Sequence, residues 1–372
     1  MATINLKIAE LRKRKGITQQ ELADVLGVSF QTISKWETGV TMPDLSILPT
    51  LADFFCVTTD ELLGLKALEG EQYIPSNKNS NTYWNSQLEY LLRTRKQMWN
   101  IDYIQFLIEK VWNISKPINI LDCGCGYGFL GTILLPLLPE GSTYTGIDFS
   151  ENLIRAGEEY FSNTNFKANL ICDNVLTYTD NKKYDFVINQ AVLRHLDNPK
   201  EFLMKMILLA KDGGIVACIE VSRPIESDGL YIKGMDYSYL CEKGGFYKLW
   251  DKELESQGRD YSISMKIPDM MKQFGLKNVD VRLNDKVSFI TIDDENYDQI
   301  VSDFINSHGW HEQILDEDDD KKIEFLINHG MDKKDADEYC KKQKKIARFL
   351  NKNKANLTYT HILGLMISYG RK

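Results

Sequence analysis

The chain has no run of 18 apolar residues, and its N-terminus has neither the apolar core nor the small-residue cleavage site of a secretory signal. We therefore expect a cytoplasmic protein with no membrane contact. Seven cysteines are scattered along the sequence without a C-x-x-C pair, so neither a disulfide framework nor a zinc ribbon is predicted. We expect reduced thiols.

An excess of positive charge is also lacking, because the formal net charge at pH 7 is −8. Such a chain does not coat nucleic acid or an anionic membrane over its whole surface, so any DNA contact must be local. The 372 residues, 43% hydrophobic and 26% charged, suffice for two or three domains with a substantial core. No internal repeat is visible.

Residues 1–65 carry apolar side chains at helical spacing, which predicts five short helices. The run "TQQELADVLGV" begins at Thr18 and has Glu21 three residues later, the spacing of a capping box, and Gly27 ends this helix. Ser29 caps the next helix, "SFQTISKWETG". Two helices joined by a tight glycine-containing turn form the helix-turn-helix arrangement.

The segment "ITQQELADVLGVSFQTISKWETGVTMPDLSILPTLADFFCVTTDELLG" resembles helix-turn-helix domains of the lambda-repressor and Cro type, also called the xenobiotic-response-element type. The resemblance covers nearly all of residues 4–64 and implies that the second helix of the motif enters the major groove of double-stranded DNA. The residues implied to contact DNA are Gln19, Ser29, Phe30, Gln31, Thr32, Ser34 and Lys35. Gln31 could pair with adenine, Thr32 could touch a thymine methyl, and Gln19 suits a phosphate.

The charge of this helical head is not that of a strongly basic DNA binder. Residues 1–66 hold seven Lys and Arg against eight Asp and Glu, and only Arg12–Lys15 forms a positive patch. A protein-binding or dimerising role is therefore an alternative to DNA binding. Because single domains of this type bind weakly, a specific DNA site would imply a homodimer on two half-sites.

Residues 66–82, poor in aliphatics and rich in Asn, Ser and Gly, are typical of a linker. A second domain is predicted over residues 83–372. After a helical region, strands and helices alternate, which predicts a parallel sheet with helices on both faces. The expected strands are "INILDCG", "TYTGIDF", "NLICDN", "YDFVINQ" and "GIVACIEV".

The later part of this domain departs from the alternation. An aromatic-rich segment at 225–262 could form a lid over a flat substrate or pack in the core. A helical insertion at 295–355 is expected between two strands that pair antiparallel. His308 and His311 have helical spacing for a metal ion, but no carboxylate or cysteine set completes the shell, so we expect no metal.

The loop "ILDCGCGYGFLG" fits two cofactor patterns: G-x-G-x-x-G at Gly126, Gly128 and Gly131, and D-x-G-x-G-x-G from Asp122. Both patterns need glycine for a strand that turns at once into a helix. Asp122 favours S-adenosylmethionine, because a carboxylate repels a dinucleotide's pyrophosphate and attracts a sulfonium and an ammonium. Asp148, which ends the next strand, could accept hydrogen bonds from the ribose hydroxyls of either cofactor.

Residues 117–224 resemble the class I S-adenosylmethionine-dependent methyltransferases, whose fold is a seven-stranded Rossmann-like α/β sheet. "ICDNVL", "YDFVINQAVLRHLDNP", "LLAKDGGIVACIE" and the final "HILGLMISYG" match the family in order and spacing. The resemblance implies S-adenosyl-L-methionine as cofactor. The residues implied to bind it are Asp122, Cys123, Gly124, Gly126, Gly128, Asp148, Phe149, Asp173, Asn174, Val175, Asn189 and Gln190.

The sequence says less about the methyl acceptor, because transfer from a sulfonium needs little beyond a nucleophile held in line. His195 is predicted as a general base, with loop packing as the alternative. Glu220 is the second catalytic candidate. Arg223, Tyr231 and Tyr237 are candidate substrate-binding residues.

The acceptor is not expected to be a DNA base, because "NQAV" stands where amino-methylating DNA enzymes have a D/N/S-P-P-Y/F/W run. We therefore expect an enzyme that methylates a small molecule and carries a DNA-binding head for transcriptional regulation. The alternative is a transcriptional regulator whose methyltransferase-like domain senses S-adenosylmethionine or another ligand with little turnover.

Overall fold

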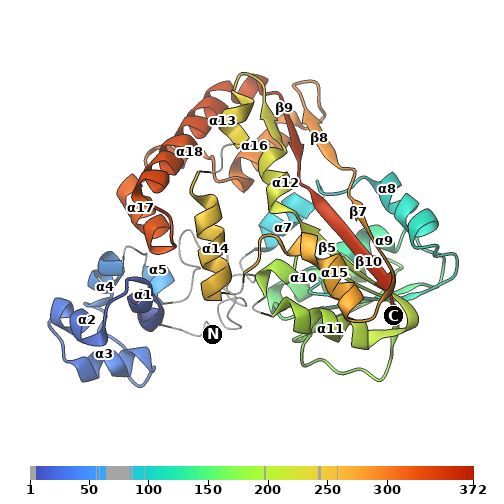
Figure 1. Ribbon diagram of the computed structural model, residues 1–372, viewed down its shortest axis with the longest axis horizontal. Helices are drawn as coiled ribbons and strands as arrows, with labels where there is room; N and C mark the ends of the chain where they lie inside the picture. Colours follow the sequence, from blue (N-terminus) through green and yellow to red (C-terminus); the bar gives the residue numbers. More distant parts are fainter. Residues whose placement is uncertain are drawn as a thin grey trace.

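The computed structural model describes residues 6–372 except 56, 58, 64–83, 85–86, 96, 197, 242–243 and 258. The linker predicted at 66–82 lies outside the described residues. A small group of helices at the N-terminus is followed by a larger α/β unit (Figure 1). Over the described parts of the chain, no helix combines the length and the apolar character needed to cross a bilayer.

Over its described residues, the N-terminal head consists of five helices, as predicted: α1 (Ile8–Arg14), α2 (Gln19–Leu26), α3 (Phe30–Glu37), α4 (Leu48–Phe55) and α5 (Thr59–Leu62). The predicted capping box is present, since the Thr18 side chain accepts from the Glu21 N–H and the Glu21 carboxylate accepts from the Thr18 N–H. Gly27 ends α2 in the left-handed conformation, and Ser29 caps α3. Fully buried apolar residues from all five helices form the core of this head.

The α/β unit is built on a seven-stranded sheet with strand order β3-β2-β1-β4-β5-β10-β7. The strands are β1 (Asn119–Cys123), β2 (Thr143–Asp148), β3 (Lys167–Cys172), β4 (Tyr184–Gln190), β5 (Ala210–Val221), β7 (Lys277–Leu283) and β10 (Leu365–Arg371). Strands β1 to β5 pair in parallel, and β10 returns antiparallel between β5 and β7. The expected fold class and the late antiparallel pair are confirmed.

Helices cover both faces of this sheet. One apolar core packs the sheet against α7 (Leu88–Arg95), α8 (Ile101–Phe106), α9 (Phe129–Leu134) and α10 (Glu151–Ser162). The core on the other face includes α11 (Pro199–Leu209) and α15 (Ile263–Gln273). The carboxyl ends of the parallel strands therefore lie between two helical layers, where ligands of such sheets bind.

A second sheet differs from the sequence-based expectation. The single strand expected near 278–290 is divided into β7 and β8 (Val287–Ile290), and "HILGLMISYG" is divided into β9 (Tyr359–Ile362) and β10. Strands β6 (Leu230–Ile232), β9 and β8 form a three-stranded sheet. The chain leaves β9 for β10 through Gly364, whose φ of +68° suits glycine at this bend.

The segment at 225–262 contains most of α12 (Arg223–Asp228), followed by β6, α13 (Tyr237–Cys241) and α14 (Phe246–Gln257). The expected helical insertion contains α16 (Tyr297–Ser307), α17 (Asp319–Asn328) and α18 (Lys333–Asn353). In Figure 1, the head lies below α17, and the two meet where the Lys15 ammonium lies 3.2 Å from the Glu324 carboxylate. A partly exposed pair of this kind contributes on the order of 1 kcal/mol or less.

Candidate active site

The loop between β1 and α9 is shaped by its glycines. Gly124, Gly126 and Gly128 have φ values of +77°, +58° and +79°, a region that other residues rarely adopt. A Cβ on Gly124 would lie 2.6 Å from a methyl of Val192, so a side chain would also collide with the loop after β4. The glycines therefore keep both the turn and the space above β1.

Asp122 lies at the end of β1 and is 1% exposed. Its Oδ2 accepts a 2.6 Å hydrogen bond from the Tyr144 hydroxyl, while Oδ1 has no hydrogen-bond partner within the described structure. Burial raises the pKa of Asp122 to about 7, against the opposing effect of the Tyr144 hydrogen bond. A buried carboxyl group with one unpartnered oxygen suits a cationic ligand group.

Asp148 lies at the end of β2, and its two oxygens hold the loops on either side of it. Oδ2 accepts a 2.9 Å hydrogen bond from the Gly126 N–H, and Oδ1 accepts one of the same length from the Ser150 N–H. Burial raises the pKa of Asp148, although these backbone donors favour its ionised form. Each carboxylate oxygen has a second lone pair that can accept from a ligand hydroxyl.

A cavity opens above these two carboxyl groups. It brings together seven of the residues singled out from the sequence: Asp122, Gly124, Gly126, Asp148, Phe149, Gln190 and His195. The cavity lies at the carboxyl ends of β1, β2 and β4, where the motifs predicted a cofactor.

The other residues predicted to bind the cofactor do not line this cavity. Cys123 and Asn189 are fully buried, the former in the core of the opposite face of the sheet. Gly128, which directly precedes α9, lies against the ring of Phe161. Residues 173–175 follow β3, where Asp173 is exposed and its N–H bonds to the Asp148 carbonyl. Their proposed contacts with a cofactor stay predictions.

The sequence did not single out three residues that cover the cavity: Trp84, Leu91 and Arg95, from the segment before the sheet. Helical spacing places Leu88, Leu91 and Arg95 on one face of a helix. An arginine on an otherwise apolar face was therefore the one feature of the sequence that could have indicated a role for this helix in the site. Nothing in that spacing showed which loop the face would meet. In the structure, the charge of Arg95 acts on Asp122 and partly offsets the rise in the pKa of that carboxyl group that burial causes.

His195 follows β4 in a short 3₁₀ turn (Leu193–His195), is 5% exposed and lines the cavity. Its ring packs edge-on against Trp84, with 5.4 Å between centroids. Its Nε2 accepts a 3.0 Å hydrogen bond from Nε of Arg194. Burial, together with the nearby arginines, holds the pKa of His195 well below its usual value, so the imidazole is neutral at pH 7.

Glu220 is fully buried at the end of β5 and does not line the cavity, and its catalytic role stays a prediction. Its Oε1 accepts hydrogen bonds of 2.9 Å from Asn189 Nδ2, 2.9 Å from the Val192 N–H and 2.8 Å from the Leu193 N–H. Oε1 of Glu220 therefore holds the loop after β4, in which His195 lies, while Oε2 has no hydrogen-bond partner among the described residues.

The three substrate-binding candidates lie away from the cavity as well. Arg223, which follows β5, forms an ion pair with Glu226 in α12. Tyr231 and Tyr237 are 45% and 49% exposed, and the Tyr237 hydroxyl donates to the Asp228 carbonyl. The two tyrosines therefore lie at the surface near the small sheet and do not line the cavity, and their role in substrate binding stays a prediction.

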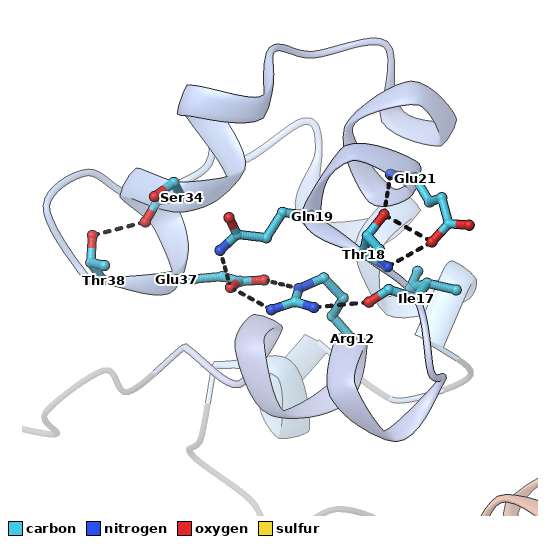
Figure 2. A network of polar contacts seen from close by, with 8 residues as sticks. All are labelled: Arg12, Ile17, Thr18, Gln19, Glu21, Ser34, Glu37 and Thr38. Carbon is cyan, nitrogen blue, oxygen red and sulfur yellow. Dashed lines mark hydrogen bonds and ion pairs between the residues drawn. The ribbon is translucent and has the colours of Figure 1, made fainter.

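In the head, a buried ion pair joins α1 to α3. Figure 2 shows the Arg12 guanidinium donating to both carboxylate oxygens of Glu37, with Nη2 and Oε2 3.0 Å apart, and donating through Nη1 to the Ile17 carbonyl. The Gln19 side chain also donates to Glu37, at 2.6 Å. The charge of Arg12 is thus neutralised inside the head. Gln19, which was predicted to contact a DNA phosphate, donates one N–H of its side-chain amide to Glu37 instead.

Helix α3 presents part of its predicted DNA-reading surface to solvent. Phe30 is 43% exposed, and Gln31 and Lys35 are also exposed. Ser29 and Thr32 bond to one another through their hydroxyls at 2.9 Å, while the Ser29 hydroxyl also caps the helix. Ser34 is half-buried and accepts a hydrogen bond from the Thr38 hydroxyl through its carbonyl (Figure 2).

Comparison with known protein families agrees with this architecture. Residues 85–281 match the family described as a methyltransferase domain, and residues 8–62 match the family described as helix-turn-helix. Since the first match spans more than half of the chain, the chain belongs to the methyltransferase-domain family, and its head is a helix-turn-helix domain. The cofactor of this methyltransferase family is S-adenosyl-L-methionine.

Individual relatives are distant. A ubiquinone biosynthesis O-methyltransferase of Rickettsia bellii is 28% identical over 160 residues, which cover 43% of this chain and 65% of that protein. A demethylmenaquinone methyltransferase of Anoxybacillus flavithermus is 29% identical over 181 residues, 46% of this chain and 76% of that protein. A solved structure of phosphoethanolamine N-methyltransferase 2 from Haemonchus contortus is 14% identical, with a TM-score of 0.39, covering 73% of this chain and 52% of that one.

Proposed function

We propose that this chain transfers the methyl group of S-adenosylmethionine to a small molecule and that its head binds double-stranded DNA to regulate transcription. The observation that carries the first part is the pair of opposite charges in one cavity. Asp122 offers a carboxyl group with an unpartnered oxygen, and Arg95 offers a guanidinium. The amino-acid end of the cofactor carries an ammonium and a carboxylate, which are complementary to these two groups.

The other cavity residues fit the rest of such a cofactor. Asp148 would accept hydrogen bonds from the ribose hydroxyls, and the glycine loop lets the backbone approach the ligand closely. Trp84 and Leu91 cover the cavity and would exclude water. When bound, the cofactor supplies an electrophilic methyl on its sulfonium, so the chain's own task is to hold an acceptor in line with it.

The small-molecule acceptor is supported by the relatives, whose names place them in the methylation of ubiquinone and menaquinone precursors. The chain spans 65% of the length of the first of these relatives, so its acceptor is proposed only as a class. The DNA-binding role is supported by the exposed side chains of α3, chiefly Phe30, Gln31 and Lys35.

The test is to incubate the full chain with methyl-labelled S-adenosylmethionine and a metabolite extract, and to ask which fraction takes the label. Label in a small-molecule fraction supports the proposal and identifies the acceptor. Label in added DNA contradicts the proposed acceptor class. The matched control is the same chain carrying Arg155→Gln, an exposed change on α10 that should leave transfer unchanged.

A second function is favoured by the surroundings of His195. Its Nε2 is already engaged by Arg194, and Glu220, whose Oε1 accepts from the loop backbone, does not line the cavity. The same domain could therefore serve a transcriptional regulator as a sensor of S-adenosylmethionine. No methyl transfer despite calorimetric binding of the cofactor, with operator affinity that changes on binding, would support this function instead.

A further inference from the structure

The loop after β4 places a guanidinium group directly behind the cavity wall. Nε of Arg194 donates to His195, whose ring lines the cavity. Nη1 of Arg194 is buried and has no hydrogen-bond partner among the described residues. Arg194 thus has a donor available one side chain away from the place where an acceptor would meet the cofactor.

Arg194 also differs from its neighbouring arginines in its charge partners. Arg223 is paired with Glu226, and Arg259 lies 3.6 Å from Glu253. In the described structure, no carboxylate lies within ion-pair distance of Arg194. Burial and the charges of Arg223 and Arg259 lower the pKa of Arg194 to about 10, although the more distant charges of Glu226 and Glu220 oppose this shift, so the group remains charged at pH 7. A charge in this position is stabilised by an anion that comes from outside the chain.

Two further donors follow β5, the neighbour of β4 in the sheet. Ser222 directly follows β5 and is fully buried, and its hydroxyl has no partner among the described residues. Nε of Arg223 is likewise buried and has no hydrogen-bond partner among the described residues. Hydroxyl and guanidinium N–H groups are the donors that carboxylates and phosphates accept from. Neither residue lines the cavity, so the unpartnered donor nearest to it is that of Arg194, which reaches the cavity wall through His195.

Resting on the proposed function, we propose that Arg194 binds an anionic oxygen group of the methyl acceptor, a carboxylate or a phosphate, so that the acceptor is an acid. The planar guanidinium suits two-point contact with such a group. When Arg194 turns toward the anion, it releases Nε2 of His195 at the cavity wall. The neutral imidazole then accepts the proton from the acceptor's nucleophile, so substrate binding and base activation are linked.

The test measures anion binding by calorimetry to the full chain saturated with S-adenosylhomocysteine. The probes are benzoate and phenyl phosphate, with neutral benzamide as the matched control ligand. We expect at least one anion to bind, benzamide to bind about tenfold more weakly or worse, and Arg194→Gln to weaken anion binding about tenfold or more. Arg194→Lys should restore part of the affinity, and Arg155→Gln, on an exposed face of α10, should leave it unchanged.

Preference for benzoate or for phenyl phosphate distinguishes a carboxylic acid from a phosphate ester. Failure of both anions to bind, benzamide binding as tightly as benzoate, or unchanged anion affinity in Arg194→Gln would overturn the inference. S-adenosylhomocysteine binding is measured separately in every variant. Its absence in the parent chain counts against the proposed function, whereas its presence without anion binding counts against this inference alone.

Discussion

The Tyr144 hydroxyl donates a 2.6 Å hydrogen bond to Oδ2 of Asp122 and so joins the second strand to the first at the base of the cavity. This bond favours the ionised carboxylate, while burial opposes ionisation and raises the pKa of Asp122 to about 7. The other oxygen has no partner among the described residues. The charge state of Asp122 therefore changes near physiological pH, next to the proposed position of the ligand ammonium.

This pKa predicts pH-dependent cofactor affinity. The ligand ammonium favours ionised Asp122, so the affinity for S-adenosylhomocysteine should be highest above about pH 7 and fall as protonation neutralises the carboxyl group below it. Calorimetry between about pH 8 and pH 6 measures this fall. Asp122→Asn should bind more weakly at pH 8 and show a flatter profile, since it has no carboxyl group to titrate. A parent profile that is flat across this range would contradict the assignment.

The Tyr144 hydrogen bond provides an independent test. Tyr144→Phe keeps the ring that packs against Phe161 but removes the donor that lowers the pKa of Asp122. The midpoint of the affinity profile should therefore move to higher pH, with affinity preserved well above it. A midpoint that stays in place would show that the hydroxyl does not control this carboxyl group.

Arg95 should contribute comparably to cofactor binding. Arg95→Gln keeps much of the side-chain volume but removes the charge opposite the cofactor carboxylate, so the affinity for S-adenosylhomocysteine should fall about tenfold or more, about 1.4 kcal/mol. Arg93→Gln is the matched control on the same helix, since Arg93 is exposed and lies 3.9 Å from Asp303 instead. Equal losses in the two variants would indicate a general effect on α7 rather than a ligand contact.

The contrast between Asp122 and Arg95 shows what the sequence could reveal about the site. Asp122 lies inside a motif whose spacing encodes a strand, a turn and a helix, so local sequence predicted its place at a strand end. Arg95 meets the same cavity only because α7 packs across the glycine loop. That contact depends on tertiary packing between segments far apart in the chain, which helical periodicity does not specify.

The fold shows the same division. The five parallel strands were predicted because each is a short apolar run bounded by turn residues. The division of the last strands between two sheets was not predicted. Only a few residues separate β7 from β8 and β9 from β10, so each pair looks like one continuous strand in the sequence. Likewise, Glu220 was predicted from its place at a strand end, whereas its three donors come from β4 and the loop after it, which only the folded chain brings close to β5.

Asp148 should affect both ligand affinity and stability. Its oxygens accept the N–H groups of Gly126 and Ser150, so Asp148→Ala removes these acceptors as well as the proposed ribose contact. We expect about tenfold or greater loss of S-adenosylhomocysteine affinity, and a destabilisation of about 1–3 kcal/mol from the unsatisfied donors. Asp148→Asn, which retains one acceptor, should be more stable than Asp148→Ala. Unchanged affinity in both variants would count against the ribose contact.

The Arg12–Glu37 pair should be important for the stability of the head. Its side chains are only 12% and 6% exposed, and Glu37→Gln would leave the Arg12 charge without its carboxylate. We expect the head to lose about 3 kcal/mol of unfolding free energy. The pKa of Glu37 is lowered by its partners, so the stabilisation is present above its unfolded-state pKa and is lost as pH falls through the folded one. Urea unfolding of the full chain, read by hydrogen exchange in α1 and α3, tests both expectations.

The exposed face of α3 should read DNA in two separable ways. Gln31→Ala should relax base preference at one operator position and cost about 1–3 kcal/mol there, because the amide is suited to pairing with adenine. Lys35→Ala should weaken binding across sequences and make its salt dependence shallower, because a lysine contacts phosphates. Sequence selection with the full chain, followed by titrations at several salt concentrations, measures both effects.

The matched control for this face is Gln20→Ala, since Gln20 is exposed on α2 and donates to Asp24 within its own helix. It should leave base preference and salt dependence unchanged. If Gln31→Ala and Gln20→Ala behave alike while the parent selects a defined sequence, another residue of the head reads the bases. If the parent selects no sequence at all, the head does not act as a sequence-specific DNA-binding domain, and its exposed Phe30 and Gln31 then fit a protein partner or a second copy of the chain better.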